Sequence, residues 1–412
     1  MARTDAIVLG AGIVGISAAL HLAKRGLAVA LVDRRGPAEE TSYGNTGIIE
    51  GNTLFAHAFP KGFGALLRIA LKQAPEANYH LAALPGLAPW LLAYRANTRG
   101  ERALEFAKAM RPLYASAIAE HEALMGEANA TRYLRKDGWL KLYRSDDSFA
   151  GTARERAYAT ELGLSHRVMT PDEARLLEPS LAPVFSHAVH WTEAASVSNP
   201  AAVGRAYAER FTKLGGVILK GDATTLHRSG QNWRVDTDEG PVDANEAVVA
   251  LGPWAPDLLG PLGIRLPLAF KRGYHRHYKS QGNAGLTRPI VDTDYGYCLA
   301  PMEQGIRLTT GAEFADRARR AQDRAVKQRP ADIGQGDTGK HLPAARAQGL
   351  VGTCGQALDL GLDAGGQAAR AEVLRVVGEV LVLVVVVAAG RDDAHQRQRP
   401  VFQERRRQLR AG

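Results

Sequence analysis

The chain has 412 residues, of which 45% are hydrophobic and 23% charged, and its formal net charge is +9 at pH 7. This length suffices for two domains that share a core, and the two cysteines, Cys298 and Cys354, exclude a disulfide framework and fit a reducing compartment. The positive charge does not indicate a nucleic-acid partner, because residues 317–412 hold 17 of the 52 basic residues and only 10 of the 43 acidic ones. The preceding part is nearly neutral and offers no basic face for nucleic acid.

The first 33 residues predict a strand, a tight glycine turn, a helix and a second strand. An apolar run at 6–9 leads into Gly-Ala-Gly-Ile-Val-Gly at 10–15, and a helical pattern covers 16–25. A second apolar run at 28–32 ends at Asp33. An acidic residue about twenty positions after such a turn is typical of a dinucleotide-binding unit.

Each part of this unit has a physical role. Gly10 permits the turn, Gly12 lets the backbone approach a pyrophosphate, and Gly15 lets the helix pack against the strand. The helix N-terminus attracts the phosphates with free N–H groups and partial positive charge. Asp33 is placed to bind a ribose and would repel a 2′-phosphate despite the adjacent Arg34, so we expect FAD or NAD rather than NADP.

The polar loop at 40–49 favours FAD, because its backbone donors and small hydroxyls can wrap a long dinucleotide. With this loop and the later segment Val-Val-Ala-Leu-Gly-Pro-Trp at 248–254, the chain resembles the D-amino-acid oxidase superfamily, and within it the D-amino-acid dehydrogenase branch. The resemblance runs from about residue 5 to about residue 316. The expected cofactor residues are Gly10, Gly12, Ile13, Val14, Gly15, Asp33, Arg34, Thr41, Ser42, Gly44, Asn45, Gly47, Gly252 and Trp254.

The middle of the chain predicts mixed helices and strands. Helical patterns cover 63–72, 84–94, which Pro85 and Pro89 should break, and 101–125. Asp137-Gly138 predicts a hairpin between strands at 132–136 and 139–143. Thr170-Pro171-Asp172-Glu173 predicts a capped helix, and Asn199-Pro200 begins another that ends near Leu214. Further strands are expected at 217–220, 224–228, 233–237, 247–251, 266–278, 297–301 and 306–310.

This interleaving predicts an α/β protein with two discontinuous domains. Residues 1–52 and 195–262 should form a Rossmann-type FAD-binding domain. Residues 53–194 and 263–316 should form a substrate domain with a mixed sheet, in the glutathione-reductase-like arrangement that the resemblance implies. The flavin should lie at the boundary, where ligand clefts tend to form.

The segment 271–278 is the richest in groups that could bind a substrate. Alternation in one strand would place Arg272, Tyr274, Arg276 and Tyr278 on one face, and two guanidinium groups suit a carboxylate. The resemblance implies that a strand here passes over the flavin and that arginine and tyrosine hold the substrate carboxylate. We assign that role to Arg272 and Tyr274.

Three further residues are candidates for the substrate site. His275 lies on the other face of the same expected strand, which could instead point into the flavin. Tyr297 and Arg307 lie on neighbouring expected strands. Half-buried sheet residues with no catalytic role are the alternative for all of these positions.

The resemblance implies an oxidoreductase that moves a hydride from the amine-bearing carbon of a small D-amino acid to flavin N5, giving an imino acid that hydrolyses to a keto acid. Oxidation of D-hydroxyproline, glycine or sarcosine stays open. We find no cysteine motif for a covalent flavin and no metal-ligand spacing, so we expect non-covalent FAD and no metal. The electron acceptor could be oxygen, a quinone or a carrier protein. With no signal-peptide pattern and no membrane-spanning segment, we expect a cytoplasmic protein that could touch the inner face of the membrane.

The character of the chain changes at Arg317. Phe402 is the only aromatic residue from there to the end, and Ala, Arg, Gly, Gln and Val dominate. A valine-rich run at 380–389 is too short to span a membrane, which takes about 20 apolar residues. The family should place a sheet segment and a glycine- and histidine-containing turn here, so part of the fold is missing. We hypothesise a reading-frame shift near codon 316, which would leave an unpaired sheet edge; the alternative is a genuine, largely disordered extension. The alternative to an active enzyme is an inactive FAD-binding remnant that such a shift has truncated.

Overall fold

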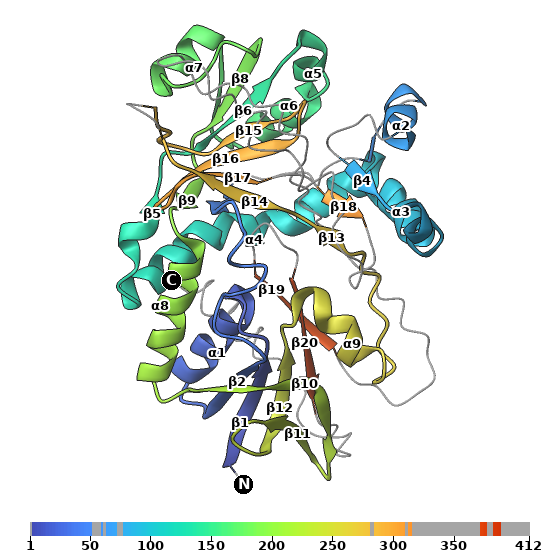
Figure 1. Cartoon of the computed structure of the whole chain (residues 1–412), viewed down its shortest axis with the longest axis vertical. Helices are drawn as coiled ribbons and strands as arrows, with labels where there is room; N and C mark the ends of the chain where they lie inside the picture. Colours follow the sequence, from blue (N-terminus) through green and yellow to red (C-terminus); the bar gives the residue numbers. More distant parts are fainter. Residues whose placement is uncertain are drawn as a thin grey trace, which may run out of the picture.

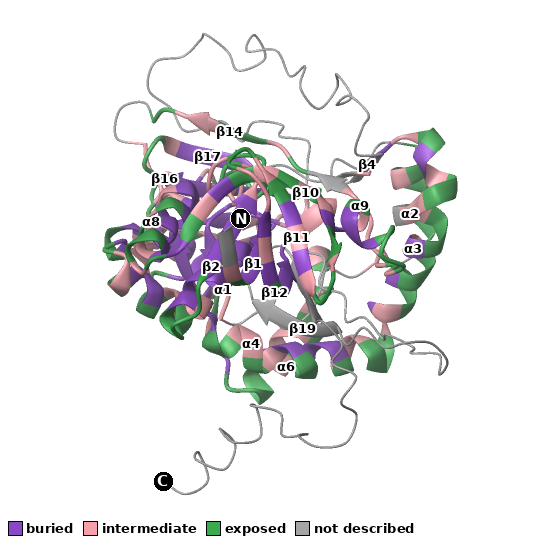
Figure 2. Cartoon of the chain, turned by 90° about the horizontal axis from the view of Figure 1, so that it is seen from below, coloured by how far each residue is buried: buried purple, intermediate pink, exposed green. Residues whose placement is uncertain are grey.

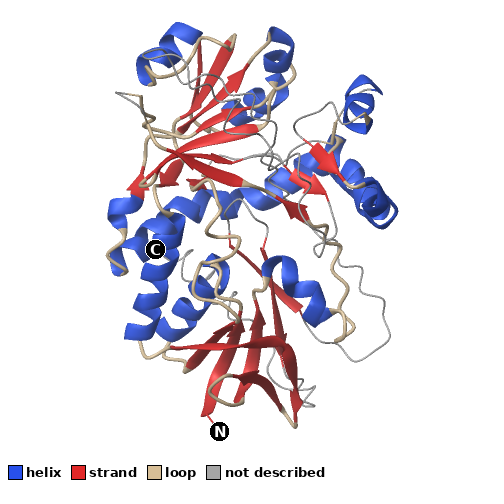
Figure 3. Ribbon diagram, viewed as in Figure 1, coloured by secondary structure: helices blue, strands red, loops and turns tan. Residues whose placement is uncertain are grey.

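The computed structural model describes residues 2–51, 59–60, 63–71, 77–280, 284–309, 312–314, 371–376 and 382–388. Two seven-stranded sheets lie toward opposite ends of the long axis, and helix α4 (Gly100–Glu127) runs between them (Figure 1). Helices flank both sheets (Figure 3). Mixed α/β architecture was therefore predicted correctly.

The lower sheet in Figure 1 is built on the predicted dinucleotide-binding unit. Strand β1 (Ala2–Leu9) lies between β2 (Val29–Asp33) and β12 (Val242–Val249) and is parallel to both. Strand β2 pairs in parallel with β10 (Val217–Ser229), which turns back into β11 (Asn232–Thr237). The carboxyl ends of β1, β2 and β12 lie at the same edge of the sheet, which is where open α/β sheets bind ligands.

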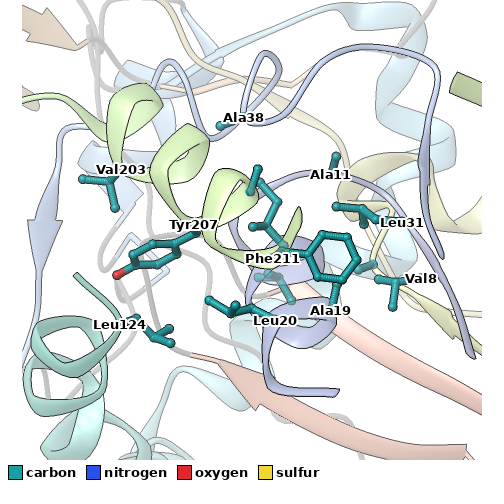
Figure 4. Packing of buried hydrophobic residues seen from close by; sticks show 14 of the residues in the cluster. Val8, Ala11, Ala19, Leu20, Leu31, Ala38, Leu124, Val203, Tyr207 and Phe211 are labelled. Carbon is teal, nitrogen blue, oxygen red and sulfur yellow. The ribbon is translucent and has the colours of Figure 1, made fainter. Parts of the chain in front are cut away.

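Two helices cover one face of this sheet. Helix α1 (Ile13–Lys24) packs against α8 (Pro200–Lys213), whose Tyr207 and Phe211 are fully buried (Figure 4). Phe211 lies near Leu20 and Ala19 of α1, so aromatic rings from α8 close the hydrophobic core over the nucleotide-binding turn. The opposite face packs against α9 (Ala255–Leu259).

The end of the chain contributes to the same sheet. Strand β20 (Val382–Ala388) pairs antiparallel with β12, and β19 (Ala371–Val376) pairs antiparallel with β20. We expected an unpaired sheet edge without assigning it to a strand; β12 is not such an edge, because β20 pairs with it. The rest of the chain after Phe314 lies outside the described residues.

The upper sheet has the strand order β14-β17-β16-β15-β6-β8-β7. Its strands are β14 (His275–Tyr278), β17 (Gly305–Thr309), β16 (Tyr297–Met302), β15 (Ile290–Asp292), β6 (Trp139–Tyr143), β8 (His187–Trp191) and β7 (His166–Met169). Short helices cover it: α5 (Asp146–Ala150), α6 (Ala153–Glu161) and α7 (Pro171–Leu177). Thr170 caps α7 through a capping box with Glu173, as the sequence predicts.

Two small sheets connect these parts. One joins β3 (Ile48–Ile49), β9 (Ala195–Val197) and β5 (Leu134–Arg135). The other joins β13 (Lys271–Arg272), β18 (Ala312–Phe314) and β4 (Ala77–Tyr79), beside helices α2 (Phe63–Ala70) and α3 (Leu84–Asn97). The limits proposed for the two domains stay a proposal; β19 and β20 of the lower sheet lie outside both ranges.

Three local predictions were wrong. Strands 132–136 and 139–143 do not form a hairpin, because β5 pairs with β9 while β6 pairs with β8 and β15. Pro89 does not break α3, which continues through it to Asn97, with Trp90 and Tyr94 buried beneath. The expected strand 266–278 is two strands, β13 and β14, which belong to different sheets.

Candidate active site

The turn between β1 and α1 excludes side chains at two positions. Gly10 has a φ of 104°, and a Cβ there would lie 2.5 Å from the Ala250 carbonyl oxygen. A Cβ at Gly15 would overlap the Gly10 carbonyl. At Gly12, by contrast, a Cβ would meet only the Ser42 hydroxyl, 3.5 Å away. Packing within the chain therefore does not require glycine at position 12, whereas close approach by a ligand does.

Two polar side chains are fixed around this turn. The Asp33 carboxylate, at the end of β2, accepts hydrogen bonds from the N–H groups of Ala11 (2.6 Å) and Arg35 (2.9 Å). The Ser42 hydroxyl accepts one from the Ile13 N–H at 3.0 Å, in the first turn of α1. The end of β2 and the loop after it are thus tied to the phosphate-binding turn, as a dinucleotide site requires.

A cavity follows this turn, the end of β2, the loop at 40–49 and the segment after β12. Twelve of the fourteen expected cofactor residues line it: Gly10, Gly12, Ile13, Val14, Asp33, Arg34, Thr41, Ser42, Asn45, Gly47, Gly252 and Trp254. Gly15 does not line it and instead permits helix–strand packing. Gly44 also lies outside the lining, and a Cβ there would be 3.0 Å from His275 Nδ1.

The cavity has lining residues that the sequence analysis did not single out. Gly221, Asp222, Ala223 and Thr224 come from β10, and His121 and Met125 come from α4. The β10 residues follow directly after Lys220, where the parallel pairing of β10 with β2 ends beside Asp33. His121 had no local signal: its Nδ1 lies 3.1 Å from the Tyr207 hydroxyl, a contact between residues 86 positions apart.

Arg34 and Trp254 form part of the cavity wall together. The Arg34 guanidinium carbon lies 4.5 Å from the centroid of the Trp254 ring, and Nη2 donates to Glu40 at 2.9 Å. Because Glu40 balances the charge of Arg34, this arginine is not set aside for a 2′-phosphate. Its place beside Asp33 suits FAD or NAD.

Arg307 of β17 is buried, with 4% of its surface exposed. Its Nη1 donates to the carbonyl oxygens of Tyr43 (2.8 Å) and Asn45 (2.5 Å), and its Nε donates to His277 Nε2 (3.0 Å). These bonds tie the upper sheet to the loop of the cavity. Arg307 therefore holds the loop in place, and its assignment to the substrate site stays a proposal.

The two faces of β14 differ from the expected arrangement. Antiparallel pairing places His275 opposite Thr309 and His277 opposite Arg307, so the two histidines share the face that contacts the loop. Arg276 and Tyr278 lie on the other face, where Tyr278 packs beside Tyr297 and Leu308. His275, which we kept as a candidate in case this face points toward the flavin, is thus on the loop side, and Arg276 and Tyr278 are not.

Tyr297 lies on that same far face, in a network with Arg144 and Asp292. Arg144 Nε donates to Asp292 at 2.8 Å and Nη2 lies 3.4 Å from the Tyr297 hydroxyl. Burial, followed by the charge of Asp292, raises the pKa of Tyr297 to about 12. Tyr297 and Arg307 are therefore not brought together. Tyr274 is half-buried between β13 and β14, and the backbone of Arg272 pairs with that of Glu313.

The described ranges hold neither a metal-binding cluster nor a membrane-crossing helix. No group of three His, Cys, Asp or Glu among those residues could hold a metal ion. No helix in that part of the chain is long and apolar enough to cross a membrane.

Comparisons with known proteins agree with this geometry. A family model described as FAD dependent oxidoreductase matches residues 5–346, which is 30 residues beyond the limit expected from the sequence. The chain is 29% identical over 312 residues to the D-amino-acid oxidase of Bradyrhizobium diazoefficiens, covering 75% of this chain and 74% of that protein. It is 30% identical over 323 residues to the D-amino acid dehydrogenase of Allorhizobium ampelinum, covering 74% and 73%.

Solved structures show the same fold. The glycine oxidase from Geobacillus kaustophilus matches with a TM-score of 0.54 at 20% identity, over 78% of this chain and 75% of that one. The L-proline dehydrogenase from P. horikoshii matches with a TM-score of 0.52 at 16% identity, over 75% and 70%. At these identities the likeness concerns the fold alone.

Proposed function

The chain belongs to the family of FAD-dependent oxidoreductases, and on that basis we propose that it oxidises the amine-bearing carbon of a small D-amino acid. The observation that carries the proposal is the cavity at the β1–α1 turn, with Gly12 open to a ligand and Asp33 fixed beside it. Relatives named D-amino-acid oxidase and D-amino acid dehydrogenase support the substrate class. FAD, when bound, supplies the acceptor for the hydride that leaves the substrate carbon.

The residues around the cavity fit FAD. In this proposal the turn at 10–15 and the N-terminus of α1 hold the diphosphate, Asp33 holds the ribose, and the loop at 41–47 follows the rest of the cofactor, with Gly252 and Trp254 opposite. Attachment is non-covalent: Cys298, the one free cysteine in the described part, is buried with Trp139 and Trp191. Arg307 keeps the loop in place through its bonds to Tyr43 and Asn45.

We assign substrate recognition to the start of the segment 271–278. Arg272 and Tyr274 bind the substrate carboxylate and so orient the α-hydrogen toward the cofactor. His275 lies on the loop side of β14, with its ring 5.5 Å from that of Tyr43, and contributes to the wall of the site. Burial, and then the charge of Arg307, lower the pKa of His275, which favours its neutral form.

The test is reduction of the bound flavin without oxygen. The purified chain is mixed in turn with D-alanine, other D-amino acids, their L-enantiomers, D-hydroxyproline, glycine and sarcosine, and flavin absorbance is followed. We expect bleaching with D-amino acids and none with the L-enantiomers. Bleaching by glycine or sarcosine alone would move the substrate assignment within the family. Bound flavin that no substrate bleaches would favour an inactive FAD-binding remnant.

A pair of arginine variants tests the carboxylate contact. Arg272→Leu should raise KM roughly 10- to 100-fold, since it removes charged hydrogen bonds to the substrate. Arg276→Leu removes the same charge from the far face of β14 and should leave KM within about twofold. Equal effects of the two variants on KM would contradict the assignment to Arg272.

A further inference from the structure

Helix α4 places one histidine in the wall of the cavity. The helix is exposed along much of its length (Figure 2), but His121 and Met125, one turn apart, both line the cavity. The lining residues of β3, β9 and α8 are all apolar: Ile48, Ile49, Val197, Pro200 and Val203. Among the described residues of this part of the wall, only His121 has a side chain that can form a conventional hydrogen bond. In an otherwise apolar wall, a single polar group fixes the orientation of a ligand.

Tyr207 of α8 determines which nitrogen of the His121 ring carries the proton. The Tyr207 hydroxyl lies 3.1 Å from the backbone carbonyl oxygen of His121 and 3.1 Å from Nδ1 of the same residue. A carbonyl oxygen can only accept, so the single hydroxyl proton is donated to it, and the hydroxyl oxygen accepts from Nδ1–H. In the neutral ring Nε2 then has no proton and is an acceptor.

Burial keeps both side chains in the protonation states that this arrangement needs. Tyr207 is fully buried in a cluster with Val203 of α8 and Leu124 of α4 (Figure 4), and burial raises the pKa of its hydroxyl, so the oxygen keeps its proton. Burial also lowers the pKa of His121, against a smaller opposing effect of Glu120, so the ring is neutral at neutral pH. No described residue donates to His121 Nε2. This acceptor is therefore available to a molecule in the cavity, which would supply the missing donor.

The position of His121 along the cavity indicates which part of FAD it meets. In the proposed function, Asp33 holds the ribose and the loop at 41–47 follows the rest of the cofactor. Strand β3 continues directly from that loop, and Ile49 of β3 lies in one hydrophobic cluster with Met125. In that arrangement His121 lies beside the riboflavin half of FAD, whose ribityl chain carries hydroxyl groups that can donate.

We propose that His121 is a cofactor-binding residue whose Nε2 accepts a hydrogen bond from a ribityl hydroxyl of FAD, and that Tyr207 positions it. The proposal rests on the proposed function in taking FAD as the occupant of the cavity, but it needs no particular substrate. The contact between His121 and Tyr207 joins a helix of the proposed substrate domain to a helix of the proposed FAD-binding domain. The site for the ribityl chain is therefore complete only when both are in place.

Titration of the flavin-free chain with FAD tests the role of the ring nitrogen. FAD is removed from the purified full chain and added back in steps, and its fluorescence gives the dissociation constant. His121→Phe keeps a flat ring without an acceptor and should raise that constant roughly 3- to 10-fold, as expected for one hydrogen bond. His121→Gln keeps an acceptor at a similar reach and should stay within about twofold of the unaltered chain.

A second histidine supplies the matched control. His166 of β7 is half-buried and does not line the cavity, so His166→Phe should leave the dissociation constant of FAD unchanged. Circular dichroism shows that each variant is folded.

Analogues of FAD that each lack one ribityl hydroxyl test the partner of the nitrogen. On the unaltered chain one analogue should bind more weakly than FAD, and on His121→Phe that analogue and FAD should bind equally. Nitrogen NMR of the His121 ring should show Nε2 without a proton in the unaltered chain and a mixture of tautomers in Tyr207→Phe. The effect of Tyr207→Phe on FAD affinity should disappear when it is combined with His121→Phe.

Several results would overturn the proposal. These are full FAD affinity in His121→Phe, equal losses in His121→Phe and His166→Phe, a protonated Nε2 in the unaltered chain, or the same analogue penalty with and without the His121 ring nitrogens. No FAD binding by the unaltered chain would overturn the proposed function as well. Bound flavin that no amino acid bleaches, together with the expected affinities, would contradict only the proposed activity and would support the role of His121.

Discussion

At the scale of single residues, the site depends on a backbone that admits no side chain at Gly15. A Cβ there would overlap the Gly10 carbonyl and also lie 3.3 Å from the Ala250 side chain. Gly15→Ala should therefore destabilise the chain by about 1–3 kcal/mol, since the turn and α1 must move apart. FAD retention should fall with it, because the turn carries the diphosphate site. Urea unfolding and the ratio of flavin to protein after gel filtration measure the two effects.

Gly126 offers a matched glycine in a helix. It lies inside α4, and nothing would come within 4 Å of a Cβ placed on it. Gly126→Ala should be neutral or should stabilise the chain by about 0.5–1 kcal/mol, because alanine loses less conformational freedom in a helix. If both alanine variants kept flavin and stability equally, the close contact at Gly15 would not be a constraint.

His277 should make cofactor binding depend on pH. Its Nε2 accepts a hydrogen bond from Arg307 Nε, which only an unprotonated nitrogen can do. Burial, and then the positive charge of Arg307, lower the pKa of His277 below its ordinary value of 6.5. The folded protein thus favours neutral His277. The contribution of this preference to the free energy of unfolding is fully present above pH 6.5 and declines as the pH falls toward the lowered pKa.

Flavin affinity across pH measures this effect. The dissociation constant of FAD should rise as the pH falls through the lowered pKa of His277, because Arg307 then loses an acceptor and gains a like charge, which loosens its hold on Tyr43 and Asn45. His277→Gln keeps an acceptor that does not titrate and should flatten the pH profile. His275 has a pKa lowered by the same causes, so its glutamine variant is measured alongside. A profile that His277→Gln leaves unchanged would remove this histidine from the argument.

At the scale of elements, α7 shows how a short capping sequence stabilises one helix. The Thr170 hydroxyl accepts the Glu173 N–H, and the Glu173 carboxylate accepts the Thr170 N–H at 2.9 Å. Thr170→Ala should lower the free energy of unfolding by about 1 kcal/mol. Thr160→Ala, at an exposed hydroxyl that donates only to the Arg156 carbonyl of its own helix, should change it by less than about 0.5 kcal/mol. Urea unfolding compares the two, and equal losses would mean that the capping box contributes nothing particular.

Elements whose signals are local could be predicted, and those that depend on distant partners could not. The turn at Gly10 and the acid at Asp33 carry their own structural requirements, so the first βα unit was predicted correctly, and 12 of the 14 expected cofactor residues line the cavity. Gly138, with a φ of 68°, indicated a hairpin turn, yet a Cβ there would overlap the carbonyl of Trp191 on β8. The glycine permits this long-range approach, and sequence patterns do not contain that information.

The same limit applies to the site. The face of β14 that meets the loop depends on pairing with β17, in which His277 is opposite Arg307. The alternation of 271–278 could show only that one of two faces is involved. His121 likewise reaches the cavity because α4 packs against α8, where it meets Tyr207.

At the scale of the whole molecule, the end of the chain departs from its family. The family match ends at residue 346, so the last 66 residues lie outside it. We retain the hypothesis of a reading-frame shift. Under this hypothesis, β20 occupies the place beside β12 that a different segment occupies in the family fold. The strands at 371–376 and 382–388 would then be the outcome of a valine-rich segment meeting an open sheet edge, which offers unpaired N–H and C=O groups to any extended chain.

This view predicts that β20 keeps the chain from aggregating. Val248 and Val249 of β12 are buried and pair with Val386 and Val385 of β20. A chain that ends at residue 370 lacks β19 and β20, so the β12 edge becomes open to other molecules, and light scattering should rise with protein concentration. A chain that ends at residue 390 loses only the arginine-rich end and should scatter as the full chain does. If the two shortened chains behave alike, the pairing of β20 does not protect the sheet, and the edge must be covered in another way.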